Sequence, residues 1–113
     1  MRYGMAIEFR LLTWGTEDDL VKRHHIQNLL DERLLAENNG ETAGGDIGSG
    51  TMNVYLMKIV DTDRALNAVL DILSNLDLLD DVTIYRETPT NDNDGTFVSQ
   101  AIWPRYKTEA FDF

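Results

Sequence analysis

The sequence predicts an α+β fold in which helices cover an antiparallel sheet. Three observations lead to this prediction: polarity alternates near the N-terminus, a glycine-rich stretch leads directly into an apolar run, and two segments carry apolar residues at helical spacing. The 113 residues suffice for one hydrophobic core, because domains commonly contain about 100 to 150 residues. We therefore expect a single domain.

The first strand is predicted over residues 3 to 14. Its apolar positions alternate with more polar or smaller ones, which is the period of a strand with one buried face. One set is Tyr3, Met5, Ile7, Phe9 and Leu11, and the other is Gly4, Ala6, Glu8 and Arg10.

A helix is predicted from about Glu17 to Glu37, with Thr16 as its N-cap. Its apolar arc on a helical wheel consists of Leu20, Ile26, Leu30, Leu34 and Leu35. The string Asn38-Asn39-Gly40 is typical of a left-handed helix end, so we expect the helix to stop there.

A β-hairpin is predicted next, with strands over residues 41 to 47 and 51 to 60 and a turn at Gly48-Ser49-Gly50. The second strand is apolar on both faces. One face would carry Met52, Val54 and Leu56, and the other Tyr55, Met57 and Ile59. We therefore expect a central strand in which both faces are at least partly covered.

The second half of the chain begins with an N-cap at Asp61, Thr62 or Asp63. An amphipathic helix follows, whose apolar side consists of Ala65, Val69, Ile72, Leu73 and Leu76. A short strand is predicted at residues 82 to 85 and a polar linker at 88 to 95. In the aromatic-rich C-terminal segment, residues 97 to 103 form a candidate fifth strand that Pro104 ends.

The predicted order of strand, helix, two strands, helix and strand resembles the ferredoxin-like βαββαβ fold. This resemblance implies that the first and third strands lie in the middle of the sheet and that both helices cover one face. We assign residues 1 to 87 to this domain, and residues 88 to 113 to a linker and a segment that packs on the sheet or on a second subunit. The fold alone implies no function.

Composition and charge exclude several classes of protein. The 20 acidic and 10 basic residues give a net charge of −10, which repels phosphates, so we expect neither nucleic-acid nor membrane binding. No cysteine is present, which excludes disulfides and thiol catalysis. No apolar run has the length of a membrane span, and no signal-peptide pattern is present. We therefore expect a cytoplasmic location.

No motif indicates a metal, a cofactor or a catalytic centre. His24 and His25 would project about 100° apart on a helix and cannot chelate one ion together. The segment Thr90 to Gly95 lacks the strongest calcium ligands, because Thr90 and Ala101 stand where acidic residues belong. The glycines before residue 51 precede a strand, whereas a phosphate loop precedes a helix. We expect no cofactor.

Two functional hypotheses remain. The first is a small acidic, non-catalytic protein-binding module, such as an inhibitor or immunity-type protein, which binds a basic partner and forms a homodimer. Its candidate residues are Asp71, Asp77, Asp80, Asp81, Trp103 and Tyr106. The second is a regulatory or enzymatic small-molecule site on the open sheet face or at a dimer seam, with candidate residues Glu8, Arg10, His24, Tyr55 and Lys58. We favour the first because no catalytic constellation is visible.

Overall fold

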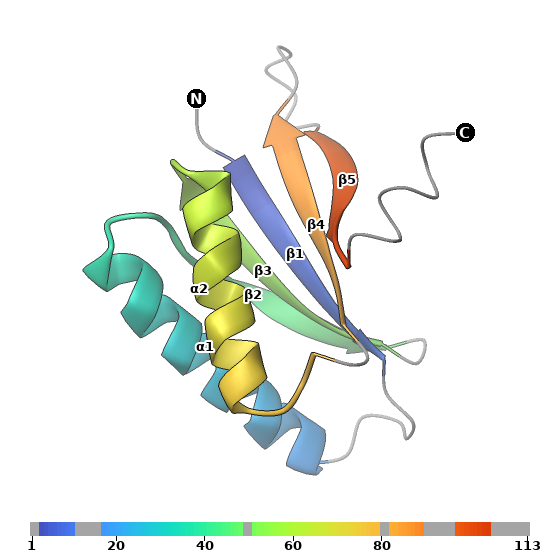
Figure 1. Ribbon diagram of the computed structural model, residues 1–113. Coiled ribbons are helices and arrows are strands. Elements are labelled where there is room, and N and C mark those ends of the chain that lie inside the picture. The colour runs from blue at the N-terminus through green and yellow to red at the C-terminus, as the bar shows by residue number, and fades with distance from the viewer. Residues whose placement is uncertain (1–2, 11–16, 49–50, 80–81, 90–96, 105–113) are drawn as a thin grey trace.

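The computed structural model describes residues 3–10, 17–48, 51–79, 82–89 and 97–104. These residues form an α+β fold with a five-stranded antiparallel sheet and two helices (Figure 1). The elements are β1 (Tyr3–Arg10), α1 (Glu17–Ala36), β2 (Glu41–Gly48), β3 (Thr51–Ile59), α2 (Thr62–Asn75), β4 (Val82–Pro89) and β5 (Phe97–Trp103). The strand order across the sheet is β2-β3-β1-β4-β5, so β1 is central and β2 and β5 are the edges.

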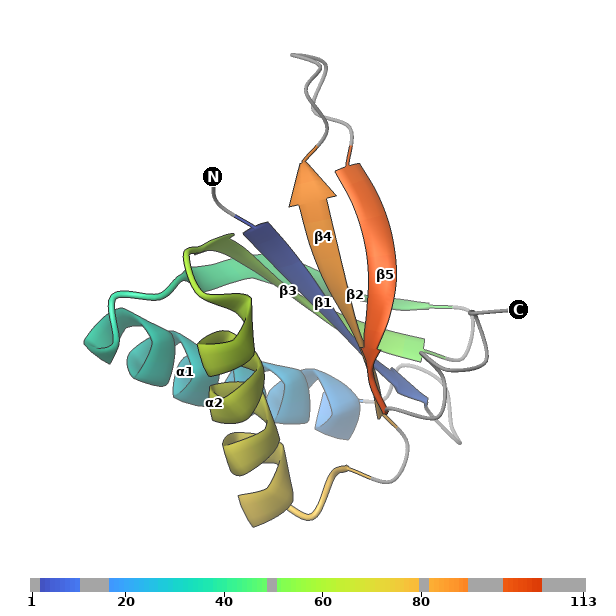
Figure 2. The same cartoon turned by 45° about the horizontal axis from the view of Figure 1, so that its top comes forward.

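Both helices lie on the same side of the sheet, as Figure 1 and Figure 2 show from two directions. We call the opposite side the open face, because no helix of the described residues covers it. The hydrophobic core lies between the sheet and the helices. Most of its members recur every second residue in the strands and every third or fourth in the helices. They are Met5, Ile7, Phe9, Ile26, Leu30, Leu34, Met52, Val54, Leu56, Ile59, Ala65, Ala68, Val69, Leu73, Val82 and Ile84. The predicted alternation of the first strand is confirmed.

One core prediction fails in α1. The sequence places Leu35 in the apolar arc, yet its side chain is 54% exposed. Leu34 is fully buried, and consecutive helical residues project about 100° apart, so Leu35 turns away from the sheet. The stripe that packs on the sheet follows the four-residue spacing of Ile26, Leu30 and Leu34.

The predicted alternation of β3 is wrong at its end, where the strand contains a bulge. Ile59 was predicted on the same face as Tyr55 and Met57, but it is fully buried in the core. Lys58 has a left-handed φ of 58°, and the register of β1 against β3 shifts at this end of the strand. The extra residue returns Ile59 to the helix side of the sheet.

β4 is longer than the sequence suggests. The predicted strand ends at residue 85, whereas β4 continues to Pro89. Its extension is held by pairing with β5, in which Glu87 lies opposite Ser99 and Thr88 opposite Val98. Part of the predicted polar linker is therefore strand. The candidate fifth strand is confirmed with its predicted bounds.

The N-cap of α2 agrees with the sequence. Asp61 is the N-cap, and its Oδ1 accepts a hydrogen bond of 3.1 Å from the backbone nitrogen of Arg64. Of the predicted turn at Gly48-Ser49-Gly50, Gly48 is instead the last residue of β2, and the other two residues lie outside the described residues. Other predictions that fall outside them are the N-cap at Thr16, the strand at residues 11 to 14, the side chain of Leu20 and the segment Thr90 to Gly95.

Candidate functional site

On the open face, one tyrosine lies on each side of the central strand β1. Ala6 of β1 is paired with Tyr55 of β3 on one side and with Tyr85 of β4 on the other. Strands lie about 4.8 Å apart, so the two tyrosine positions are about 10 Å apart with only a methyl group between them. Glu8, two residues further along β1, lies on the same face.

Carboxylates surround Tyr55. Its hydroxyl donates a hydrogen bond of 3.0 Å to Asp46 Oδ2, and the Asn53 side chain donates one of 2.7 Å to Asp46 Oδ1. Burial raises the pKa of Tyr55, and the nearby negative charges of Asp46, Glu87 and Glu8 raise it further. Three acidic groups from three different strands therefore contribute to the raised pKa of one tyrosine.

Tyr85 and Glu87 extend this arrangement along β4. Burial raises the pKa of Tyr85, while Glu8 raises it and Arg10 lowers it. Burial also raises the pKa of Glu87. The side chain of Glu87 lies against Gly4, where a Cβ would come within 3.2 Å of Glu87 Oε1. The ion pairs within the described residues do not include Glu87, so its carboxylate loses hydration without gaining a cation.

The residues predicted for a small-molecule site are divided between different parts of the fold. Glu8, Arg10 and Tyr55 share the open face. His24 is exposed on α1, on the helix side of the sheet. Lys58 lies in the bulge of β3, and its Nζ is 2.8 Å from Glu41 Oε1. The structure therefore gathers three of the five residues.

The residues predicted to bind a protein partner are also dispersed. Asp71 is exposed on α2, and its Oδ2 is 3.2 Å from Nη1 of Arg33. Asp77 is exposed just beyond the end of α2, with a φ of 59°. Trp103 is half-buried and packs against the core. Asp80, Asp81 and Tyr106 lie outside the described residues.

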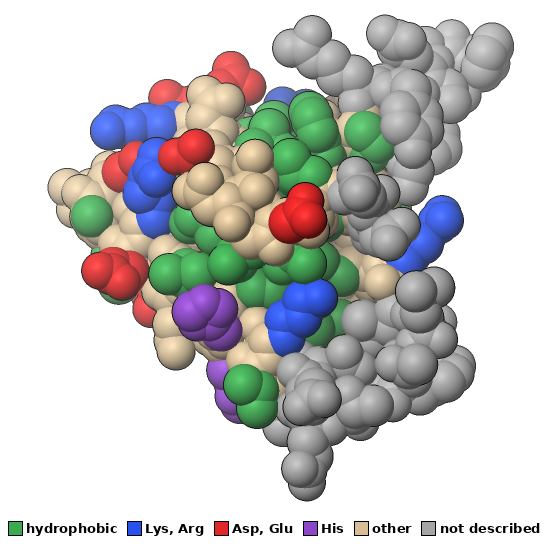
Figure 3. All heavy atoms as spheres, turned by 60° about the horizontal axis from the view of Figure 1, so that its bottom comes forward, with side chains coloured by type: hydrophobic (Ala, Val, Ile, Leu, Met, Phe, Trp, Pro, Cys, Tyr) green, Lys and Arg blue, Asp and Glu red, His purple; other side chains and the backbone are tan. Residues whose placement is uncertain are grey.

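On the helix side of the molecule, opposite charges are mixed. In Figure 3, several acidic side chains adjoin basic ones, while hydrophobic side chains gather beside the two histidines. Part of this mixing comes from the ion pairs of Arg33 with Glu37 and with Asp71. The negative charge around Asp71 is thus partly neutralised, whereas the ion pairs within the described residues do not include Glu8, Asp46 or Glu87.

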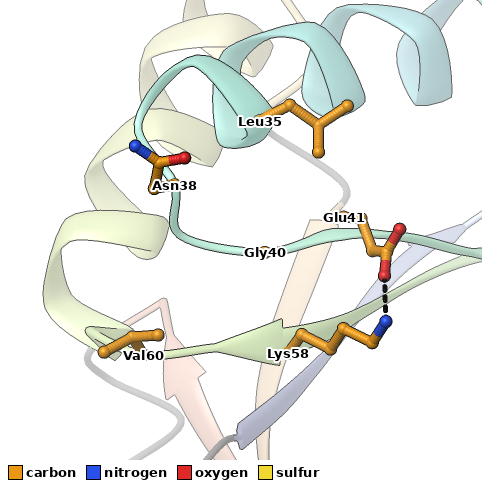
Figure 4. Close-up of a pocket in the computed structure, with 6 residues that line it drawn as sticks. All are labelled: Leu35, Asn38, Gly40, Glu41, Lys58 and Val60. Atoms are coloured by element: carbon orange, nitrogen blue, oxygen red, sulfur yellow. Dashed lines mark ion pairs between the residues drawn. The ribbon is translucent and has the colours of Figure 1, made fainter.

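A shallow pocket of about 220 Å³ lies where α1 ends and β2 begins. It is lined by Leu35, Asn38, Gly40, Glu41, Lys58 and Val60 (Figure 4). Leu35 and Val60 are both more than half exposed, and the ion pair of Lys58 and Glu41 lies beside them. This pocket was not predicted, because it depends on the exposure of Leu35 and on the bulge at Lys58.

The open-face residues Asp46, Tyr85 and Glu87 were also missed by sequence reasoning. Each belongs to a predicted strand or its extension, so their alternation was visible. What the sequence did not reveal was the register that places them beside Tyr55 and Glu8.

In the described ranges, no group of three His, Cys, Asp or Glu residues is arranged to hold a metal ion. Nor is any described helix long and apolar enough to cross a membrane.

Comparison with known proteins adds no relative. No protein-family model, curated protein or solved structure matches the chain.

Proposed function

We propose that this chain is a non-catalytic protein-binding module whose open face binds a basic partner. The observation that carries the proposal is the group of three carboxylates around Tyr55, of which Glu87 is desolvated without a cationic neighbour in the described structure. A lysine or arginine side chain from a partner would neutralise this charge and form charge-assisted hydrogen bonds.

The two tyrosines support the same proposal. A cation held above a tyrosine ring is attracted by the negative charge of the ring face, by about 0.5 to 2 kcal/mol depending on how well it is desolvated. Tyr55 and Tyr85 stand on either side of Ala6, which leaves space between them for a long side chain. The net charge of −10 would also accelerate the encounter with a basic partner.

We also infer a ferredoxin-like unit formed by β1 to β4 and the two helices. The support is the chain order, with α1 between β1 and β2 and α2 between β3 and β4, together with the neighbour order β2-β3-β1-β4. In this interpretation β5 is an additional strand beside β4. The unit presents the open face but does not by itself specify a function.

A charge-removal experiment tests the binding proposal. The triple variant Glu8→Gln, Asp46→Asn, Glu87→Gln removes the carboxylates around Tyr55 while keeping their approximate shape. The probe is a short peptide of alternating arginine and serine, and its Kd is measured by calorimetry at low salt. We expect the triple variant to bind at least about tenfold more weakly, because each removed charge contributes about 0.5 to 1 kcal/mol.

The matched control is the triple variant Glu32→Gln, Asp63→Asn, Asp77→Asn, which removes the same number of exposed charges from the helix side. It is expected to weaken binding only slightly, through the change in net charge. Equal losses in the two triple variants would contradict the proposal, since they would show that the peptide senses total charge and not the open face.

The small-molecule hypothesis remains the second candidate. Its specific support is that Glu8, Arg10 and Tyr55 share the open face, which provides both signs of charge for a zwitterionic ligand. A thermal-shift screen of metabolites would reveal a compound that raises Tm by mass action. Such a compound should lose its effect in Arg10→Gln, whereas peptide binding should persist in that variant.

A further inference from the structure

The two edges of the sheet differ in how they are protected. At the β2 edge, Asp31 Oδ1 of α1 accepts a hydrogen bond of 3.0 Å from the backbone nitrogen of Thr42. The register of β2 then shifts between Thr42 and Gly45, where Gly44 has a φ of 92°. An occupied donor and a bulge both hinder the addition of another strand. The β2 edge is therefore protected against pairing.

The β5 edge is less protected, because its register against β4 shifts only near its end, between Ala101 and Trp103. β5 is the one strand of the described five that carries no charged residue, although 27% of the chain is charged. Val98 is 61% exposed, and Ser99 and Gln100 are also exposed. Within the described residues, no strand pairs with the outer side of β5. Uncharged, exposed edge strands with high β-propensity readily pair with a further strand.

The sequence of β5 is symmetric in residue type about its centre. The order in Phe-Val-Ser-Gln-Ala-Ile-Trp is aromatic, β-branched, small, amide, small, β-branched, aromatic. In an antiparallel pair of identical strands related by a two-fold axis at Gln100, each residue meets one of its own kind. Pairs of such residues across strands are favourable relative to pairs of alanine.

We propose that two copies of this chain associate through β5, antiparallel and about a two-fold axis at Gln100. Gln100 then faces Gln100 of the second copy, and Ser99 faces Ala101 of the second copy. Such an interface is isologous, because both copies use the same surface. The two sheets join into one, and both open faces lie on the same side of it.

The contacts of Gln100 within one copy are compatible with this pairing. Nη2 of Arg86 donates a hydrogen bond of 2.8 Å to Gln100 Oε1, which fixes the side-chain amide. An amide oxygen accepts two hydrogen bonds, so the amide nitrogen of the second copy can donate to it as well. The register of β4 against β5 shifts between Ala101 and Trp103, so regular pairing is expected for Gln100 with Gln100 and for Ser99 with Ala101, at the centre of the interface.

Charge gives this association a distinctive salt dependence. Each copy has a net charge of −10, and β5 contributes no charge. Two copies therefore repel each other through charges elsewhere on their surfaces and not through the β5 edge. Screening by salt should therefore strengthen the dimer. Binding of a basic partner to the open face should instead weaken with salt. The two proposals are thus separable and can fail independently.

The test measures the mass of the full chain by sedimentation at rising salt concentration. We expect a species of twice 12.9 kDa whose fraction increases with salt. Val98→Lys adds a charge at an exposed position of β5 and should shift the dimer to monomer by at least tenfold in Kd. The matched control is Ala43→Lys on the exposed β2 edge, which should leave the Kd within about twofold.

The chain contains no cysteine, so Gln100→Cys provides a specific test of register. Paired residues in antiparallel strands have Cα atoms about 4.5 to 5.5 Å apart, within the range of a disulfide. We expect rapid cross-linking of Gln100→Cys under mild oxidation and little for Ala43→Cys. A chain that stays monomeric at high salt, equal cross-linking at both positions, or equal dissociation by both lysine variants would overturn the proposal.

Discussion

Asn39 binds the backbone of Asp61 at two points, which fixes the end of α1 to the start of α2. Its Nδ2 donates a hydrogen bond of 2.8 Å to the carbonyl oxygen of Asp61, and its Oδ1 accepts one of 2.8 Å from the nitrogen of Asp61. The same Oδ1 also accepts from the nitrogen of Val60 at 3.0 Å. Asn39 is only 3% exposed. One buried amide therefore satisfies three backbone groups from a distant turn.

The first prediction concerns this amide. Asn39→Ala should lower the free energy of unfolding by about 2 to 4 kcal/mol, because it leaves buried backbone groups without partners. The measurement is urea denaturation followed by circular dichroism. The control is Asn38→Gly, at an exposed position with a φ of 53°, which should leave the stability unchanged or raise it slightly. A loss below about 1 kcal/mol for Asn39→Ala would refute this structural role.

The second prediction concerns the bulge of β3. Lys58 has a φ of 58°, which disfavours side chains branched at Cβ. Lys58→Gly should be neutral or stabilising within about 1 kcal/mol, since it relieves this strain and loses only an exposed ion pair with Glu41. Lys58→Val should lower the free energy of unfolding by about 1 to 3 kcal/mol. If valine were tolerated as well as glycine in denaturation experiments, the bulge would not have the left-handed geometry described.

The third prediction concerns the pH dependence at Glu87. Burial raises the pKa of this carboxyl above 4.5 in the folded state, so folding favours its protonated form. The contribution of Glu87 to the free energy of unfolding should therefore decrease as the pH rises from below 4.5 through the folded pKa. Glu87→Gln should be more stable than the parent at pH 7 and nearly equal to it at about pH 3, where Glu87 is protonated.

Denaturation at both pH values checks this expectation. A Glu87→Gln variant that is less stable than the parent at pH 7 would show that the carboxylate is stabilised by a cation. In that case the open face would already be neutralised before any partner binds.

The fourth prediction concerns the close approach of β2 to β3. A Cβ at residue 45 would overlap the carbonyl oxygen of Asn53 and contact the side chain of Arg23. Gly45→Ala should therefore lower the free energy of unfolding by about 1 to 3 kcal/mol. Ala43→Gly, at an exposed position of the same strand, should cost only about 0.5 to 1 kcal/mol. Equal costs in calorimetric unfolding would exclude a steric effect at Gly45.

Local patterns were sufficient to predict most of the elements. The alternation around Ile7, the cap at Asp61 and the apolar run ending at Trp103 are each encoded within a few residues, and the corresponding elements agree with the structure. The sequence was less informative where the register of two strands decides on which face of the sheet a side chain lies. Ile59 lies on the helix side of the sheet and not on the open face because Lys58 before it has a left-handed conformation. The resulting bulge is visible only in the register of β3 against β1.

The candidate site was predictable only in part for the same reason. Glu8 and Tyr55 were chosen as polar groups of the sheet, and they share the open face. Asp46 joins Tyr55 across the predicted hairpin, but the hydrogen bond between them depends on the exact register of that hairpin. Glu87 joins them from a strand far along the chain, and no local pattern indicates this. Similarly, the acidity around α2 was visible in the sequence, but the pairing of Asp71 with Arg33 was not, because 38 residues separate them.

The most direct test of the binding proposal is a map of where a basic peptide contacts the protein. Backbone amide resonances are followed by NMR as the arginine and serine peptide is added. If the open face binds the peptide, the shifts concentrate at Ala6, Tyr55, Tyr85 and their neighbours on that face and diminish as salt is raised. Shifts that instead concentrate along α2, around Asp71 and Asp77, would contradict the binding proposal.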